Sequence, residues 1–339
     1  MMTSLPIPLP APFTVRGITF DPALFCAPMA NITHSAFRRL VADFGGYGAL
    51  FTEMLSVKSV LQEDPRHSPW LKRRPGDGKL IYQLLVSDVK GLPECLERLA
   101  PLRPEGIDLN CGCVAPKVLR RGGGAALFDD LERLRTVVRV MRRHVEGPLF
   151  VKFRLGHQSD DWRARLVARL RLLEGEGVDV VTIQPRFSEE PRGRRVRHEL
   201  YGELSAETTL PIVANGDISA ARCPADQALA FAPAAGLMIG RMAAVQPWIF
   251  AKWHQPALVV DYTDVWRRLC DYIAEDFEPH KALLRLKIVT PYLARNFVFG
   301  HNLFRAIQPA PDFATARERG SSFMEATPAL QRSISPSGI

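Results

Sequence analysis

Two cysteines stand one residue apart in the stretch "DLNCGCVAPKVLRRGGGAALF", residues 108–128, and three consecutive glycines follow them. A cysteine thiol can give a proton or attack a carbon atom, but a buried cysteine can also serve only as a small apolar side chain. Cys111 and Cys113 are therefore both candidates for a chemical role, and their spacing alone leaves the choice open.

Further polar residues occur where short apolar runs end. Lys152 lies in "PLFVKFRL", and the turns "NGDI" and "GRMAA" follow two later runs. Gly216 and Gly240 would let the backbone approach an anion, and Arg241 would add charge, so these turns predict a phosphate site. Lys152 is consistent with a cation beside a group that becomes anionic, and equally with a lysine that extends its ammonium into solvent.

Eight short apolar runs carry these polar ends, and patterns of helical spacing separate most of them. The runs are "ALFCAPM", "GALFTEM", "LIYQLLV", "GIDLN", "PLFVKFRL", "VDVVTIQP", "PIVANGD" and "AGLMIGR". The helical patterns cover residues 34–44, 89–102, 129–144 and 160–176. Eight β/α units in about 250 residues are typical of an α/β fold of the TIM (β/α)8 barrel type, whose strand ends carry the active site. An open doubly wound sheet is the alternative, because counting strands does not show closure.

Only helical patterns follow residue 253, in "YTDVWRRLCDYIAEDF" and "KALLRLKIVTPYLARNFVFGHNLFRAI". We therefore expect two domains, a barrel over residues 1–256 and an all-helical domain over residues 257–339. The last residues, "SISPSGI", are expected to be frayed.

Composition narrows the class of protein. A chain of 339 residues with 47% hydrophobic residues is too large for a single small domain. Its net charge of +8 favours an anionic partner such as nucleic acid, although an arginine-rich composition can also reflect the base composition of a gene. Six cysteines without a CxxC pair predict reduced thiols and no metal site. The absence of a long apolar stretch and of a secretion signal predicts a cytoplasmic protein with no membrane partner.

Eight motifs stand in series along residues 20–253: "APMANITHSAFR", "TEM", "YQLL", "DLNCGCVAPKV", "GGGAALF", "VKFRLG", "VANGDI" and "LMIGRMAAVQPWIF". In order and spacing they resemble those of the dihydrouridine synthases, flavin enzymes that reduce uridine in transfer RNA. The wording "LNCGC" is similar to the C-type bacterial subgroup of that family. The resemblance implies FMN as the cofactor, NADPH as the reductant, tRNA as the partner and an RNA-binding role for the C-terminal helices. We also expect a monomer.

The resemblance also implies roles for individual residues. Cys113 is implied as the acid that protonates the base, and Cys111, nearer the strand, is then expected to pack in the core. Asn110 is implied to meet the target base, and we expect Arg154 and Gln184 to bind substrate as well. Cofactor contacts are implied for Pro28, Met29, Ala30, Gln83, Lys152, Asn215, Gly216, Asp217, Gly240 and Arg241. The glycines at 122–124 are expected to let the loop turn tightly over flavin and base.

Two positions depart from the family pattern. Val114 replaces the proline that follows the family's cysteine, and Gln184 with Pro185 replaces a histidine–glycine pair at the end of the sixth run. Glutamine can form hydrogen bonds to a phosphate or to a uracil edge, but it cannot carry a proton.

Two groups of basic residues are candidates for contacts with RNA phosphates. One group follows the sixth run, at the mouth of the predicted barrel, and the other lies in the helical region. They are Arg192, Arg194, Arg195 and Arg197, and then Lys281, Arg285, Lys287 and Arg295.

Two other functions are compatible with the same residues. An FMN barrel could reduce a free pyrimidine or another small alkene, but such a substrate requires neither the basic mouth nor the helical region. A non-catalytic RNA-binding barrel is the other alternative, suggested by Val114 and Gln184.

Overall fold

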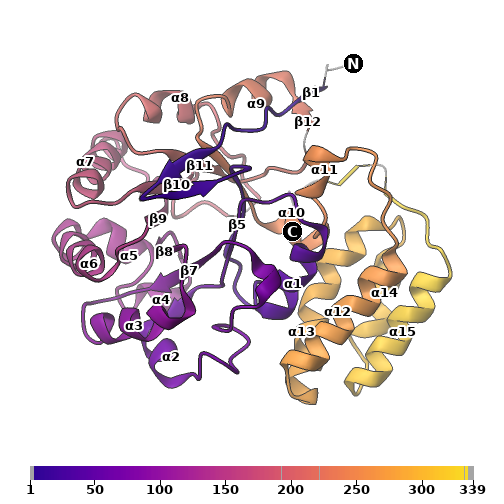
Figure 1. Ribbon diagram of the computed structural model, residues 1–339. Coiled ribbons are helices and arrows are strands. Elements are labelled where there is room, and N and C mark those ends of the chain that lie inside the picture. Colours follow the sequence, from indigo (N-terminus) through magenta and orange to yellow (C-terminus); the bar gives the residue numbers. More distant parts are fainter. Residues whose placement is uncertain (1–3, 192, 221, 332, 335–339) are drawn as a thin grey trace.

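The structure is a computed structural model that describes residues 4–191, 193–220, 222–331 and 333–334. Eight strands form the centre of the larger part of the molecule (Figure 1). Their bounds are β4 Leu24–Cys26, β5 Ala49–Phe51, β7 Leu80–Leu85, β8 Gly106–Cys111, β9 Leu149–Arg154, β10 Val180–Gln184, β11 Ile212–Asn215 and β13 Gly236–Ile239. Each strand lies within one of the eight predicted runs, except that β8 extends one residue beyond its run, to Cys111.

The sheet closes on itself. β5 pairs with β7 through Leu50 and Leu80, and β13 pairs with β4 through Leu237 and Leu24. All neighbours in the ring run parallel. The predicted TIM barrel is therefore confirmed, and the open doubly wound sheet is wrong.

One end of the barrel interior is apolar and sealed. Inward-facing Phe51 lies edge-on to Phe25 and Phe150, with ring centroids 6.2 and 5.9 Å apart. A hairpin of β2 (Phe13–Val15) and β3 (Ile18–Phe20) covers the N-terminal ends of the strands, and its Phe20 is fully buried. We did not predict this hairpin, because strands of three residues carry almost no periodicity. A ligand must therefore enter at the opposite, C-terminal end of the strands.

Helices surround the barrel. They are α1 Ser35–Phe44, α2 Val57–Gln62, α3 Leu92–Leu99, α4 Pro116–Leu119, α5 Ala125–Asp129, α6 Leu131–His144, α7 Trp162–Gly175, α8 Leu200–Ser205, α9 Ala225–Ala230, α10 Arg241–Val245 and α11 Ala251–His254. In α6 the buried side chains are Leu134, Val137, Val138 and Met141, which form one helical face against the sheet. None of the helices in the described parts of the chain is both long and apolar enough to cross a membrane.

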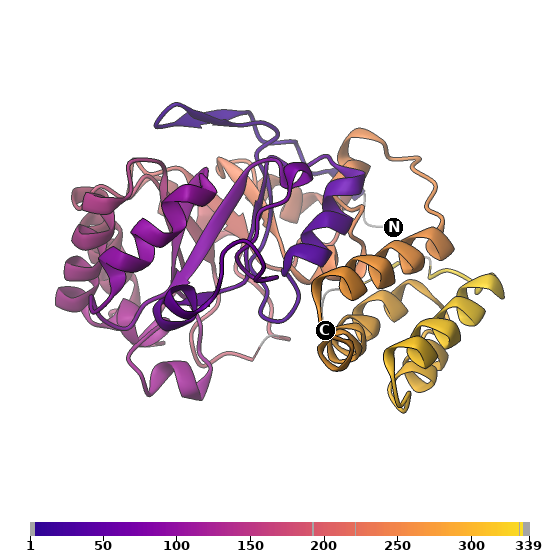
Figure 2. The same cartoon turned by 60° about the horizontal axis from the view of Figure 1, so that its bottom comes forward.

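Four further helices lie beside the barrel, in orange to yellow in Figures 1 and 2. They are α12 Tyr262–Asp276, α13 Pro279–Leu293, α14 His301–Ile307 and α15 Phe313–Glu325. Their apolar core includes Trp266 and Ile273, and it continues into the barrel through Leu40 and Trp248. Most of the tail that we expected to be frayed lies outside the described residues.

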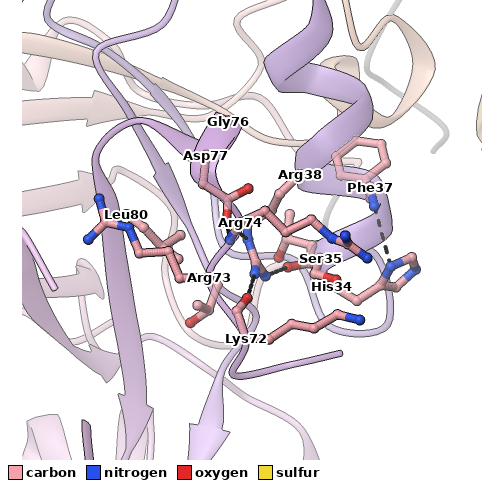
Figure 3. Close-up of polar contacts among 12 residues, drawn as sticks. His34, Ser35, Phe37, Arg38, Lys72, Arg73, Arg74, Gly76, Asp77 and Leu80 are labelled. Carbon is pink, nitrogen blue, oxygen red and sulfur yellow. Dashed lines mark hydrogen bonds and ion pairs between the residues drawn. The ribbon is translucent and has the colours of Figure 1, made fainter. Parts of the chain in front are cut away.

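A polar junction joins α1, the loop before β7 and the end of α12. Figure 3 shows its residues from α1 and from this loop. Arg38 Nε lies 3.7 Å from Asp77 Oδ2, and both side chains are fully buried. Arg38 also donates to the carbonyl oxygens of Thr33 and Lys72, at 2.8 and 2.7 Å. Arg74 from the same loop donates to Asp276 of α12 at 2.5 Å. These contacts fix the helical region against the barrel on the side where α1 begins.

Candidate active site

A cavity of about 370 Å³ opens at the C-terminal ends of the barrel strands. Every residue that the sequence assigns to catalysis, cofactor or substrate lines this cavity, because parallel strands of a barrel all end at the same rim. These residues are Pro28, Met29, Ala30, Gln83, Asn110, Cys113, Lys152, Arg154, Gln184, Asn215, Gly216, Asp217, Gly240 and Arg241. Residues far apart in the sequence thus meet in one site.

The two cysteines differ in exposure. Cys111, the last residue of β8, is 1% exposed, and burial raises the pKa of its thiol well above the ordinary value. Cys113 lies in the following loop, is partly exposed and lines the cavity. Of the six cysteines, all within the described residues, only Cys113 is not buried. Geometry therefore leaves Cys113 as the thiol that a ligand can reach.

The loop that carries Cys113 is held from two sides. The backbone N–H groups of Gly112 and Cys113 donate to Asn110 Oδ1 at 3.2 and 3.0 Å, and the N–H of Ala125 donates to the Cys113 carbonyl at 3.0 Å. Gly124 has φ +60°, and a Cβ there would lie 2.4 Å from the Cys113 carbonyl oxygen. The glycines at 122–124 do not themselves line the cavity: Gly124 packs behind Cys113, and the part of the loop that borders the cavity is residues 112–115.

Two further polar side chains follow Asn110 in a chain of hydrogen bonds. Asn110 Nδ2 donates to Gln83 Oε1 at 2.8 Å, and Gln83 Nε2 donates to Asp108 Oδ2 at 2.6 Å. Asp108 is fully buried and does not line the cavity. Both atoms of the Asn110 amide thus have protein partners, and the second Nδ2 hydrogen has only a weak acceptor, Met54 Sδ at 4.0 Å, which a ligand could replace.

Lys152 lies on β9 beside Asn110, its partner in the β8–β9 register. Its ammonium has no hydrogen bond to any of the described residues. Burial lowers the pKa of Lys152, and the charge of Asp108 opposes this shift. For Asp108, burial raises the pKa, while the hydrogen bond from Gln83 and the charge of Lys152 oppose it. Lys152 is half-buried and lines the cavity, which argues against a lysine that extends into solvent and fits an ammonium that faces an anionic ligand group.

The opposite wall of the cavity is formed by the ends of β11 and β13. Gly216 has φ +119°, and a Cβ there would lie 2.9 Å from Val196. Asp217 accepts hydrogen bonds from Arg186 and Arg241, each at 2.5 Å. Two guanidinium groups thus lie beside a glycine turn at the end of a strand, which is the arrangement expected of an anion site.

Buried side chains support this turn from behind. His198 Nε2 lies 2.8 Å from the Gly216 carbonyl oxygen, and Gln227 Nε2 lies 3.2 Å from His198 Nδ1. Since the Gln227 amide donates to Nδ1, the imidazole carries its hydrogen on Nε2 and donates it to Gly216. Burial lowers the pKa of His198, which favours this neutral form. Tyr201 accepts from the N–H of Asn215 at 2.9 Å, and Asn215 Nδ2 donates to the Met238 carbonyl at 2.9 Å.

The remaining predicted residues complete the wall. Pro28, Met29 and Ala30 follow β4, and the Met29 N–H donates to Thr33 Oγ1 at 3.0 Å. Arg154 is only 9% exposed, and its guanidinium reaches carbonyl oxygens of the loop that follows β10.

Sequence reasoning missed several residues of this site. Asp108 precedes Asn110 by two residues in β8, so the period of a strand could have placed it on the same face. Arg186 stands directly after the "QP" departure, and its position at a strand end was an available signal. Tyr292 from α13 also lines the cavity, and no signal near it in the sequence predicts this.

Several of the basic side chains that we expected to contact RNA form ion pairs or hydrogen bonds within the protein. Arg197 donates twice to Glu190, both at 2.7 Å, and Arg195 lies 3.7 Å from Glu199. Arg194 is exposed, whereas Arg192 lies outside the described residues. In the helical region Arg285 is 9% exposed and donates to Asn31 Oδ1 at 2.7 Å, so its assignment to an RNA-facing surface is wrong.

Comparison with solved structures identifies the class of fold. An old yellow enzyme homologue from Zymomonas mobilis superposes with a TM-score of 0.52 over 78% of this chain and 99% of its own, at 11% sequence identity. This similarity shows a shared barrel fold. Within the described residues, no group of three or more histidine, cysteine, aspartate or glutamate side chains is placed to bind a metal ion.

Comparison of sequences identifies the family. The family model described as dihydrouridine synthase matches residues 25–297. A probable tRNA-dihydrouridine synthase from Helicobacter pylori (strain J99) is 32% identical over 230 residues, which cover 67% of this chain and 68% of the relative. A tRNA-dihydrouridine(16) synthase from Yersinia pestis is 28% identical over 314 residues, covering 86% of this chain and 97% of the relative. The chain belongs to the dihydrouridine synthase family and is a flavin-dependent oxidoreductase.

The residues present fit a flavin nucleotide. An anionic phosphate matches the Arg186 and Arg241 guanidinium groups beside Gly216. An isoalloxazine ring carries carbonyl oxygens and ring nitrogens, and it becomes anionic on reduction. Lys152, with no hydrogen bond to the described protein, supplies the matching cation on the opposite wall.

Proposed function

We propose that this protein reduces the C5–C6 double bond of specific uridines in tRNA, with FMN as its cofactor and NADPH as the reductant. The observation that carries the proposal is the meeting, in one cavity, of the one described cysteine that is not buried, the half-buried Lys152 and a glycine–arginine anion site. The family supports flavin chemistry, and the glycine–arginine site at the ends of β11 and β13 fits the single phosphate of FMN.

The chain's own residues then divide the reaction between them. Bound flavin supplies a hydride to one carbon of the uracil double bond. The Cys113 thiol gives a proton to the neighbouring carbon, so that the charge that develops on the base is neutralised. Lys152 holds a positive charge beside the flavin, and the Asn110 amide directs a donor hydrogen toward the base. The Gln184 side chain also lines the cavity, but its amide cannot take part in proton transfer.

Binding of tRNA is assigned to the two regions that border the cavity. We propose that residues 1–256 form the catalytic domain and that residues 257–339 form the RNA-binding domain. Tyr292 of the helical region reaches the cavity wall, and exposed Arg194 and Arg195 lie in the loop after β10, the strand that ends at Gln184 of the cavity wall. Extrusion of one uridine into the cavity requires that the surrounding RNA be held by phosphate contacts on both sides. A monomer that acts in the cytoplasm completes the proposal.

Purified full-length protein provides the test. It should be yellow and release FMN rather than FAD on denaturation. With NADPH and an unmodified tRNA transcript it should form dihydrouridine, detected by mass spectrometry, whereas free uridine should remain unreduced. The relative from Yersinia pestis makes position 16 the first uridine to examine in the product. Equal reduction of free uridine would contradict the proposal and favour a small-substrate reductase.

A further inference from the structure

The hydrogen bonds that run from Asp108 to the Cys113 loop have a fixed direction. The backbone N–H groups of Gly112 and Cys113 can only donate, so Asn110 must present Oδ1 to them. Asn110 Nδ2 then faces Gln83, which must present Oε1, and Gln83 Nε2 is left facing Asp108. Asp108 Oδ2 therefore accepts from Gln83 Nε2. Both amides are thus oriented from the backbone end of the chain of hydrogen bonds.

This chain of hydrogen bonds lies in a buried environment. Gln83 is 1% exposed and Asp108 is 0% exposed. Leaving a buried donor without an acceptor costs about 1–3 kcal/mol, so each link strongly favours the one orientation that satisfies its neighbour. If the Gln83 amide turned over, its oxygen would face the Asp108 carboxylate and its nitrogen would face Asn110 Nδ2. Both contacts would be repulsive.

We propose that Asp108 is a positioning residue that holds the Cys113 loop in place through Gln83 and Asn110. The inference rests on the proposed role of Cys113 as the proton donor. Asp108 does not itself line the cavity, so it can act on the thiol only through these two amides or through the charge of Lys152. The experiment must separate the two routes.

Substitutions at Asp108 separate them. Asp108→Leu removes the acceptor, whereas Asp108→Asn keeps an amide oxygen that can accept from Gln83, and both remove the charge beside Lys152. The measurement is the rate at which iodoacetamide alkylates Cys113 in the full chain, with and without FMN, because the other five cysteines are buried. We expect the rate to rise about threefold or more in Asp108→Leu, since a loosened loop exposes the thiol, and to stay within about twofold of wild type in Asp108→Asn.

Product formation from tRNA should follow the same order, falling by about tenfold or more in Asp108→Leu because a misplaced acid transfers its proton less often. An equal effect of both substitutions on alkylation would show that Asp108 acts through the charge of Lys152, and it would overturn the proposal. An unchanged alkylation rate in Asp108→Leu would overturn it as well. Alkylation needs neither tRNA nor turnover, so this readout stands even if the proposed reaction is wrong.

A pair of substitutions at Gln83 tests the direction of the hydrogen bonds and does not depend on the folding of Asp108→Leu. Gln83→Glu alone places two carboxylates against each other and should accelerate alkylation. Gln83→Glu combined with Asp108→Asn lets the new amide donate to Glu, whose second oxygen still accepts from Asn110 Nδ2. We expect the double variant to return to within about twofold of the wild-type alkylation rate. Failure of this rescue in a variant that unfolds at the wild-type temperature would overturn the proposal.

Discussion

The two walls of the cavity are built by different means. On the wall formed by β7, β8 and β9, the amides of Gln83 and Asn110 and the buried Asp108 hold the Cys113 loop through directional hydrogen bonds. On the wall formed by β11 and β13, a glycine turn with positive φ is combined with a carboxylate between two guanidinium groups. The first wall fixes the position of one atom, and the second provides charge and backbone N–H groups for an anion.

This difference matches what each wall must do. Proton transfer requires the donor within hydrogen-bond distance of one carbon, so its support must resist small displacements. An anionic group with several oxygens accepts donors from many directions, and charge matters more than the position of any single atom. The two walls should therefore respond differently to substitution, one in turnover and the other in cofactor affinity.

The largest effect is expected at the thiol. Cys113→Ala should lower dihydrouridine formation by about 10²–10⁴-fold, the usual contribution of a general acid, while FMN affinity stays at the wild-type value. Cys111→Ala is the matched control: its thiol lies in the core, so activity should persist with a small loss of stability. Single-turnover formation of dihydrouridine and equilibrium FMN titration measure the two effects. The reverse result would show that Cys111 is the acid.

On the opposite wall, Arg241→Ala should weaken FMN binding. A hydrogen bond to a charged group contributes about 1.5–3 kcal/mol, so the Kd should rise by about 10- to 100-fold. Riboflavin, which lacks the phosphate, is the matched ligand, and its affinity should change little in the same variant. Equal weakening of both ligands would show that Arg241 does not contact the phosphate.

Gly124→Ala should affect the thiol wall without touching the cavity. The new Cβ would meet the Cys113 carbonyl, and the backbone has φ +60°, so about 1–3 kcal/mol of strain is expected. Dihydrouridine formation should fall by about tenfold, and the unfolding temperature should drop by a few degrees. Gly175→Ala, with open space around its Cβ and no positive φ, is the control and should behave as wild type. Wild-type turnover in Gly124→Ala would show that the loop tolerates displacement.

The strand ends made most of this site predictable from the sequence. Parallel strands of a barrel finish at one rim, so Lys152, Asn215 and Arg241 could be brought together without coordinates. The pairings between side chains could not be predicted from the sequence. Arg197 binds Glu190 because of the conformation of the loop after β10, which no periodicity encodes. Tyr292 reaches the cavity from a helix more than a hundred residues after Lys152, so its place depends on how the helices dock.

The smallest effect concerns the support of the anion wall. Burial lowers the pKa of His198, so its imidazole stays neutral in the folded protein while a histidine of the unfolded chain takes up a proton below about pH 6.5. The unfolded state then binds more protons, and the free energy of unfolding falls as the pH falls, by at most about 1.4 kcal/mol per pH unit for each such histidine. Buried His34 has a lowered pKa for the same reason and should contribute a similar slope.

His198→Gln should remove one of these two contributions, because glutamine can donate to the Gly216 carbonyl without titrating. Urea unfolding at pH 7.5, 6.5 and 5.5 should show a shallower loss of stability in this variant than in wild type. His144→Gln at an exposed position is the control and should keep the wild-type slope. A slope that remains unchanged in His198→Gln would mean that His198 takes up a proton in the folded state and donates from both ring nitrogens. In that case the Gln227 amide would have to turn over so that its oxygen accepts from Nδ1. FMN affinity should then stay constant across this pH range.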